Sequence, residues 1–217
     1  MSEALGLIFW DLDGTLIDSV PLKGELFARV FDDHPGHHDD LVAFHLDHGG
    51  LNRTEKIRRM STEVLGIPAD EAEIERRVSR FGELTDRHLR EAPLAPGASA
   101  TLQELARSSV MHIVTAMPHD EARPILEHHG IAAYFESITG FPVRKAEAVE
   151  AVLSGYDARP PATLIGDSRE DASTAQRSGI SFIQVRLDDA AHLPGAALVL
   201  DGLEDAAARI RHAITSR

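Results

Sequence analysis

The chain has 217 residues, enough to bury a full hydrophobic core, and its 43% hydrophobic and 26% charged residues are typical of a soluble globular protein. The net charge of −13, from 22 Lys+Arg against 35 Asp+Glu, argues against nucleic acid or an anionic membrane as a main partner, because both attract basic surfaces. The absence of cysteine excludes disulfides, thiolate catalysis and Cys-ligated metal.

The first apolar segment, residues 5–10, predicts a buried strand that ends at Asp11. No basic residue precedes it, and it is too short to span a membrane, so it is unlike a signal peptide. We therefore expect a cytoplasmic protein.

The next interval, residues 20–92, contains no convincing buried strand. Amphipathic helical patterns instead occupy 22–31, 52–65 and 70–90. Proline stands at both ends of the interval, in Val20-Pro21 and in Pro93-Leu-Ala-Pro-Gly97, as expected of a hinge pair between domains. The interval predicts an inserted, all-helical cap domain within a core made of residues 1–19 and 93–217.

The rest of the chain alternates between predicted strands and predicted helices. Short apolar segments predict strands at 110–114, 137–139, 163–165, 181–185 and 197–200. Helical patterns lie between or after them at 98–108, 119–129, 145–154, 170–178 and 202–214. This alternation predicts an α/β fold with a doubly wound, mostly parallel sheet.

Acidic residues follow two of the predicted strands directly. Asp11 and Asp13 follow the first strand, and Asp167 and Asp171 follow the strand at 163–165. Because functional groups collect beyond the carboxyl ends of parallel strands, we expect these carboxylates to converge. Four carboxylates close together repel one another, and bound Mg²⁺ would relieve that repulsion.

The Asp11-Leu12-Asp13-Gly14 segment adds a second argument. Strand alternation directs Asp11 and Asp13 to one side and Leu12 to the core, and Gly14 permits a sharp turn. One carboxylate could then act as a nucleophile while its neighbour transfers protons. The competing interpretation is an acidic turn that only ends a strand.

Four segments, in order, resemble the motifs of the haloacid dehalogenase superfamily, most of whose members are phosphatases. They are Asp11–Ser19, Ile113–Ala116, Lys145 within Phe141–Ala146, and Gly166–Asp171. The first and fourth motifs are specific, whereas the second and third count mainly through their order. The resemblance covers about residues 6–185 and implies a Rossmann-like core, with the family's first type of cap where the helical insertion falls.

The resemblance also implies residue roles. Asp11 would attack phosphorus and form an aspartyl-phosphate, and Asp13 would protonate the leaving oxygen and then activate water. Mg²⁺ would be held by the Asp11 and Asp167 carboxylates and the Asp13 backbone carbonyl. Asp171 would reach the water shell of the metal, and it also fits a helix capping box with Ser168.

The same resemblance assigns phosphate binding to the Thr115 hydroxyl, the Ala116 N–H and the Lys145 ammonium group. Thr115 and Lys145 each have a simpler alternative. Thr115 could only cap a strand end, and Lys145 could be a surface lysine beside Arg144, which would then be the active cation.

A candidate substrate loop lies in the cap at residues 48–56 and resembles that of phosphoglycolate-phosphatase-like members. Arg53 and Lys56 are its candidate substrate contacts, while Asn52 with Glu55 fits a helix N-cap. Clustered histidines in the cap are not assigned to a metal, because they are distant in sequence from the carboxylates; they are His34, His37, His38, His45 and His48.

The predicted function is Mg²⁺-dependent hydrolysis of a small phosphorylated metabolite by a monomer or homodimer. Dehalogenase and phosphonatase activities are disfavoured because those branches lack the second aspartate, here Asp13. A sugar phosphomutase of the beta-phosphoglucomutase type shares all four motifs and stays open. A non-catalytic binding protein is the alternative from another class.

Overall fold

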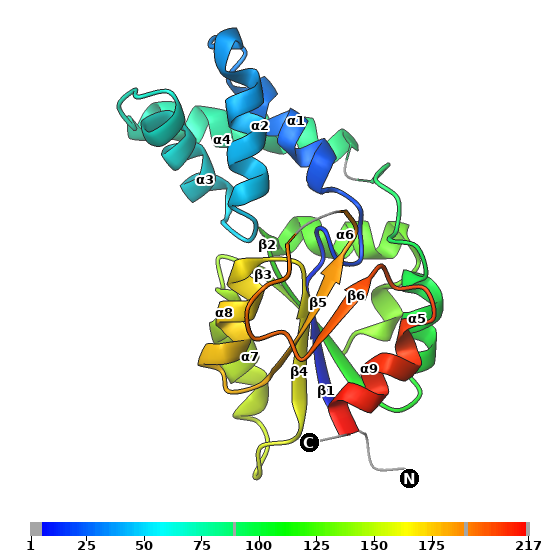
Figure 1. The fold of residues 1–217 in the computed structure, drawn as a ribbon. Helices are drawn as coiled ribbons and strands as arrows, with labels where there is room; N and C mark the ends of the chain where they lie inside the picture. The colour runs from blue at the N-terminus through cyan, green and yellow to red at the C-terminus, as the bar shows by residue number, and fades with distance from the viewer. Residues whose placement is uncertain (1–5, 89, 189–190, 216–217) are drawn as a thin grey trace. The chain divides into compact units, whose positions relative to one another are not determined.

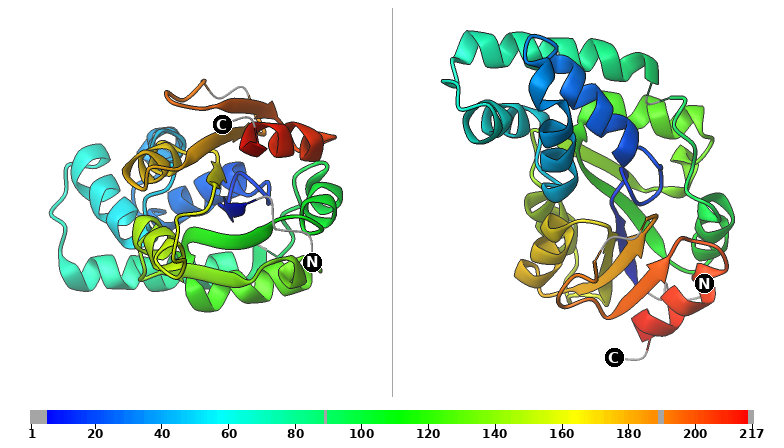
Figure 2. Two further views of the ribbon diagram at one scale, coloured as in Figure 1. Left: turned by 90° about the horizontal axis from the view of Figure 1, so that it is seen from below. Right: turned by 45° about the horizontal axis from the view of Figure 1, so that its top comes forward.

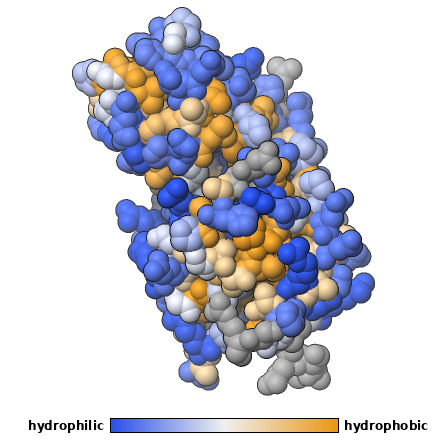
Figure 3. Space-filling model, viewed as in Figure 1, coloured by the Kyte–Doolittle hydropathy of each residue, from blue (hydrophilic) through white to orange (hydrophobic). Residues whose placement is uncertain are grey.

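The computed structural model describes residues 6–88, 90–188 and 191–215 (Figure 1). Its contacts divide the chain into two compact units. The sheet unit comprises the chain up to Asp18 and from Leu94 onward, and the helical unit is Ser19–Pro93. No helix among the described residues is long and apolar enough to cross a membrane. Hydrophilic residues cover most of the face seen in Figure 3, with apolar patches between them.

The sheet unit is built on six parallel strands in the order β3-β2-β1-β4-β5-β6. The strands are β1 (Leu7–Trp10), β2 (Val110–Pro118), β3 (Ser137–Phe141), β4 (Ala162–Gly166), β5 (Ser181–Arg186) and β6 (Leu198–Asp201). The strand order reverses direction at β1, which lies between β2 and β4. The predicted α/β class with a parallel, doubly wound sheet is therefore confirmed.

Helices cover both faces of this sheet. They are α5 (Ala98–Leu105), α6 (His119–His128), α7 (Lys145–Leu153), α8 (Arg169–Arg177) and α9 (Ala206–Thr215), with a short 3₁₀ turn, η3 (Ala132–Tyr134). Helices α7 and α8 pack side by side on one face, and α5 packs with α9 on the other (Figures 1 and 2).

The central strand β1 is buried on both faces, which explains its unbroken apolar sequence. Leu7 and Phe9 belong to the core cluster that includes α7 and α8 residues. Ile8 and Trp10 are fully buried and point to the opposite face by strand alternation. The same alternation directs the next odd-numbered residue, Asp11, toward α7 and α8.

Several predicted boundaries were wrong; α5, for example, ends at Leu105 rather than at 108. Strand β2 continues to Pro118 instead of ending at Val114, and its register with β3 shifts between these two residues. Pro118 is the last residue of β2 and directly precedes α6. The last helix starts at Ala206 rather than at 202, because Gly202 and Asp205 both adopt positive φ angles in a turn.

The helical unit contains helices and turns throughout its described residues. Its elements are α1 (Val20–Val30), the 3₁₀ turn η1 (Pro35–His37), α2 (His38–Asp47), α3 (Arg53–Arg59), the π-helical turn η2 (Met60–Val64) and α4 (Glu71–His88). Its core includes Leu26, Phe27, Leu41, Ile57 and Phe81. Helix α2 lies outside the three helical patterns predicted from the sequence, although five of its ten residues are apolar.

A buried arginine anchors this core. Arg77 of α4 is only 2% exposed, and its guanidinium group lies 4.4 Å from the centroid of the Phe31 ring. It donates hydrogen bonds to the Val30 carbonyl (2.7 Å) and to both carboxylate oxygens of Asp33 (2.9 and 2.6 Å). The hydrogen bonds from Arg77 lower the pKa of Asp33 to about 2. Arg77 therefore ties α4 to the C-terminal end of α1.

We predict that Arg77→Met lowers the free energy of unfolding by about 2 kcal/mol, because it removes the hydrogen bonds of a buried charged group. Thermal and urea unfolding would measure the loss. The adjacent Arg76 is exposed and pairs with Glu73 on the same helix, so Arg76→Met should cost less than about 0.5 kcal/mol. Equal effects of the two substitutions would contradict this assignment.

Candidate active site

Three aspartates meet beyond the carboxyl ends of the two central strands. Asp11 follows β1 and Asp167 follows β4, at the point where the strand order reverses. Asp171 lies in the first turn of α8, and one carboxylate oxygen from each of the three residues lies within 4.8 Å of the others. Within residues 6–88, 90–188 and 191–215, no other group of three His, Asp or Glu side chains meets this criterion.

Lys145 lies between two of these carboxylates. It is the first residue of α7, and only 3% of it is exposed. Its Nζ atom is 2.9 Å from Oδ1 of Asp11 and 2.7 Å from Oδ1 of Asp171. This contact is possible because α7, α8 and the Asp11 side chain share one face of the sheet. The alternative of a surface lysine is thus inconsistent with its burial.

Asp171 is completely buried and closes a capping box at the start of α8. Its Oδ2 accepts hydrogen bonds from the Ser168 hydroxyl (2.6 Å) and backbone N–H (3.1 Å), while its own N–H donates to Ser168 Oγ (3.2 Å). The predicted capping box is confirmed. Among the described residues, Lys145 is the donor to Oδ1 (2.7 Å), and that oxygen therefore keeps a further lone pair for a ligand.

Electrostatic strain accompanies this crowding. Burial raises the pKa of Asp11 to about 7; Lys145 opposes the shift, and Asp171 and Asp13 add to it. Burial, together with Asp11 and Asp171, raises the pKa of Asp167 well above its ordinary value. Burial also works against the charge of Lys145, but Asp11 and Asp171 outweigh it and raise the pKa of the lysine.

A hard divalent cation fits this donor set. The cluster offers only carboxylate oxygens, the ligands that such cations prefer. A cation would also favour ionised Asp11 and Asp167, whose pKa values are raised in its absence. The residues that could hold it are Asp11, Asp167 and Asp171.

Asp13 lies in a compact turn that follows β1. Gly14 adopts a positive φ of 75°, and the Leu16 N–H donates to the Leu12 carbonyl (3.0 Å). Asp13 is partly exposed, unlike buried Asp11, and its charge contributes to the raised pKa of Asp11. The two carboxylates therefore lie near one another in different environments.

Thr115 and Ala116 occupy the irregular part of β2, between the register positions Val114 and Pro118. Bulges of this kind redirect side chains next to active sites. Thr115 is buried, and its Oγ1 accepts a hydrogen bond from the Met117 N–H at 3.1 Å. Its hydroxyl proton is free to point elsewhere as a donor.

The two predicted substrate residues of the cap belong to the helical unit. The Arg53 guanidinium lies 5.2 Å from the centroid of the Phe81 ring. Lys56 donates to Nδ1 of His45 at 3.0 Å. The N-cap predicted at Asn52 is confirmed, since its side chain accepts the Glu55 N–H at 3.0 Å. A substrate role for Arg53 and Lys56 stays a prediction.

Gly166 opens the fourth motif, but the sequence predicts no role for it. It is the last residue of β4, and a Cβ atom at this position would lie 2.5 Å from Oδ2 of Asp171. Only glycine therefore lets α8 bring its carboxylate this close to the strand. A glycine immediately before the acidic cluster was the available signal.

These features define an α/β enzyme whose acidic site suits a divalent cation and an anionic substrate group. The model of the haloacid dehalogenase-like hydrolase family matches residues 5–179, and the chain belongs to this family. Phosphoglycolate phosphatases of Vibrio cholerae and Rhodobacter capsulatus are 30% and 32% identical to it over 192 and 194 residues. These matches cover 82% and 83% of this chain and the same shares of the relatives.

Solved structures agree on the fold. A haloacid dehalogenase-like family hydrolase from Streptococcus pneumoniae superimposes with a TM-score of 0.70 at 21% identity, over 94% of this chain and 98% of the other. The predicted family, fold class and enzyme class are confirmed. The catalytic roles of individual residues stay predictions.

We predict that Gly166→Ala lowers kcat for an aryl phosphate by about a hundredfold, because the added methyl group displaces Asp171 and with it Lys145. Circular dichroism would confirm that the fold is retained. Gly36 is the matched control, since nothing lies within 4 Å of a Cβ added there. A Gly166→Ala enzyme with more than half of the wild-type rate would contradict the prediction.

A second prediction concerns divalent metal and stability. A cation held by the assembled cluster would bind only the folded protein, so Mg²⁺ at about 100 times its Kd should raise the free energy of unfolding by about 2.7 kcal/mol, and EDTA should reverse this. Asp167→Asn should raise the melting temperature without metal at pH 7, since it removes a carboxylate whose ionised form is disfavoured in the fold. The same variant should lose most of the Mg²⁺ effect.

Thermal denaturation with and without Mg²⁺ measures both effects. Asp157→Asn is the control, because Asp157 is an exposed aspartate outside the cluster. An Asp167→Asn protein that is less stable without metal, yet equally stabilised by Mg²⁺, would disprove the metal assignment.

Proposed function

We propose that this protein is a Mg²⁺-dependent phosphomonoester hydrolase in which Asp11 is the nucleophile. The observation that carries the proposal is the position of Lys145, which holds Asp11 beside Asp167 and Asp171. Membership of the haloacid dehalogenase-like hydrolases supports the same reaction class.

Asp11 would attack the phosphorus atom of the substrate. Lys145 holds Oδ1 of Asp11 at 2.9 Å, which orients the carboxylate and leaves Oδ2 for attack. A bond forms between this oxygen and phosphorus while the ester P–O bond breaks, leaving an aspartyl-phosphate. Water then attacks the phosphorus of that intermediate, inorganic phosphate leaves, and the carboxylate of Asp11 is restored.

Asp13 would transfer the protons. It lies two residues from the nucleophile and is partly exposed, so it can exchange protons with solvent between turnovers. Asp13 protonates the leaving alkoxide in the first step and deprotonates the attacking water in the second. This role needs a carboxyl group distinct from the nucleophile, as the Asp-x-Asp spacing provides.

The Asp11 and Asp167 carboxylates and the Asp13 backbone carbonyl would hold Mg²⁺, with Asp171 completing the acidic set. When bound, Mg²⁺ neutralises charge on the phosphoryl oxygens. The Thr115 hydroxyl, the Ala116 N–H and the Lys145 ammonium group would bind the remaining phosphoryl oxygens. Together these groups form a preorganised positive environment for the transferred group.

The substrate would be a small phosphorylated metabolite of the cytoplasm. Phosphoglycolate is the first candidate, because the two relatives at 30% and 32% identity carry the name phosphoglycolate phosphatase. Residues 20–92 would act as a cap over a catalytic core of residues 1–19 and 93–217, with Arg53 and Lys56 contacting the substrate. Sugar phosphomutase activity is the competing outcome, since it uses the same nucleophile.

We predict that Asp11→Asn folds normally and lowers Mg²⁺-dependent hydrolysis of an aryl phosphate by about a thousandfold or more, because the amide cannot attack phosphorus effectively. Phosphate release from a panel containing phosphoglycolate and sugar phosphates would be measured for wild type and variant. Wild type should release inorganic phosphate, and EDTA should abolish the release.

Two controls make this test decisive. Asp157→Asn should keep wild-type activity, since Asp157 is an exposed residue outside the site. Isomerisation of a sugar phosphate without phosphate release would establish the mutase alternative. Substantial activity of Asp11→Asn would exclude Asp11 as the nucleophile.

A further inference from the structure

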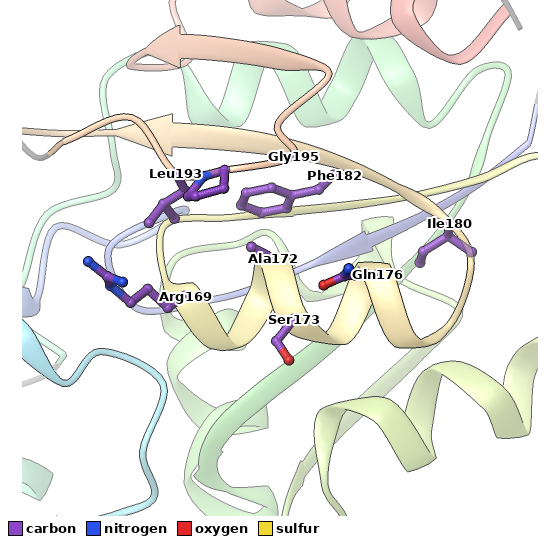
Figure 4. Close-up of a pocket in the computed structure, with 9 residues that line it drawn as sticks. Arg169, Ala172, Ser173, Gln176, Ile180, Phe182, Leu193 and Gly195 are labelled. Atoms are coloured by element: carbon purple, nitrogen blue, oxygen red, sulfur yellow. The ribbon is translucent and has the colours of Figure 1, made fainter.

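A pocket in the sheet unit lies on the outer side of α8, between that helix and the chain segment that leads from β5 to β6 (Figure 4). We call it the α8 pocket; its volume is about 430 Å³. Phe182 of β5, Ile180, Leu193 and Pro194 supply its apolar lining. This volume is within the range of pockets that bind small organic molecules.

Hydrogen bonds hold the wall of the pocket in place. Gln184 of β5 is completely buried. Its side-chain amide donates to the Ala191 carbonyl (2.9 Å) and accepts the Leu193 N–H (2.8 Å). Farther along, the Ala197 N–H donates to the Phe182 carbonyl at 2.8 Å. The segment is thus fastened to β5 on both sides of Leu193 and Pro194, so the pocket is preformed.

Helix α8 separates this pocket from the aspartate cluster. Arg169, Ala172 and Gln176, at helical spacing, line the pocket. Asp171 and Ala175, on the other side of the helix, are buried. The pocket is therefore a second site, and its lining contains none of the residues proposed for phosphoryl transfer.

Arg169 is the charged residue of the pocket lining, which also contains the polar residues Ser173 and Gln176. Figure 4 shows its side chain at one end of α8 and Ile180 at the other, with the Phe182 ring between them. Neither a hydrogen bond nor an ion pair joins Arg169 to another described residue. An uncompensated guanidinium at the end of an apolar pocket complements a ligand that is anionic at one end and has a hydrophobic ring.

We propose that the α8 pocket binds a small organic monoanion with a flat hydrophobic body, such as an aromatic carboxylate or sulfonate. Its ring would contact Ala172 and Leu193 above the buried Phe182 ring, and its anionic group would pair with Arg169. This site is independent of the phosphatase reaction, so either proposal can fail without the other.

The probe is 8-anilinonaphthalene-1-sulfonate, with the uncharged N-phenyl-1-naphthylamine as its neutral counterpart. Fluorescence titration of the whole chain should show one saturable site for the sulfonate. Mg²⁺ with excess inorganic phosphate should not displace it. Displacement by phosphate would locate the dye in the catalytic site and overturn the proposal, as would the absence of saturable binding.

Variants then locate the site. Arg169→Gln should weaken sulfonate binding by about tenfold and leave the neutral probe unchanged, because it removes only the cation. Arg177→Gln, at the other end of the same helix, is the matched control and should change neither affinity. Ala172→Leu should weaken both probes by about tenfold or more, because it fills the pocket.

Unchanged sulfonate affinity in either Arg169→Gln or Ala172→Leu overturns the proposal. Since Arg169 is exposed, its substitution keeps the test decisive even if Ala172→Leu fails to fold.

Discussion

The site depends on one lysine held between two buried aspartates. Without a positive charge, Asp11 and Asp171 would face one another in a low-dielectric environment, where repulsion favours protonation. Lys145 offsets that repulsion at distances of 2.9 and 2.7 Å. The pKa of Asp11 is nevertheless raised to about 7, so the lysine alone does not neutralise the cluster. The remaining negative charge is what makes the cluster suited to a divalent cation.

The strand order of the sheet brings these charged side chains together. Because β1 lies between β2 and β4, residues that follow these strands share one edge of the sheet. Helix α7 starts at Lys145 and α8 carries Asp171, and both helices cover the face toward which Asp11 points. The absence of a side chain at Gly166 allows the final close approach. The same packing of α7 and α8 on the sheet therefore forms both the core and the acidic site.

The helical unit has its own core and its own buried charges, which explains how it can be inserted into the chain as a compact unit. Its histidines have local partners as well. Lys56 donates to His45, and burial followed by the charge of Lys56 lowers the pKa of that imidazole well below its ordinary value. His48 lies 3.1 Å from Arg59 and stacks on Phe44. Both imidazoles therefore contact cationic side chains of the same unit.

The sequence by itself determined the features that depend on neighbouring residues. Strand-length apolar segments followed by aspartate predicted β1, β4 and the acidic edge, and the spacing of Ser168 and Asp171 predicted the capping box. Such patterns are readable because alternation, helical periodicity and capping act over a few residues. They also predicted a helical insertion, because the alternation of strands and helices stops there.

Only the tertiary structure decided what depends on residues distant in the chain. The strand order joins segments that are distant in the chain. The contact between Lys145 and Asp171 joins residues 26 positions apart. The packing of Gly166 against Asp171 brings α8 back onto the strand that precedes it. The extension of β2 past Val114 likewise depends on pairing with β3. Local patterns do not encode these pairings, because each is selected by the packing of the whole sheet and its helices.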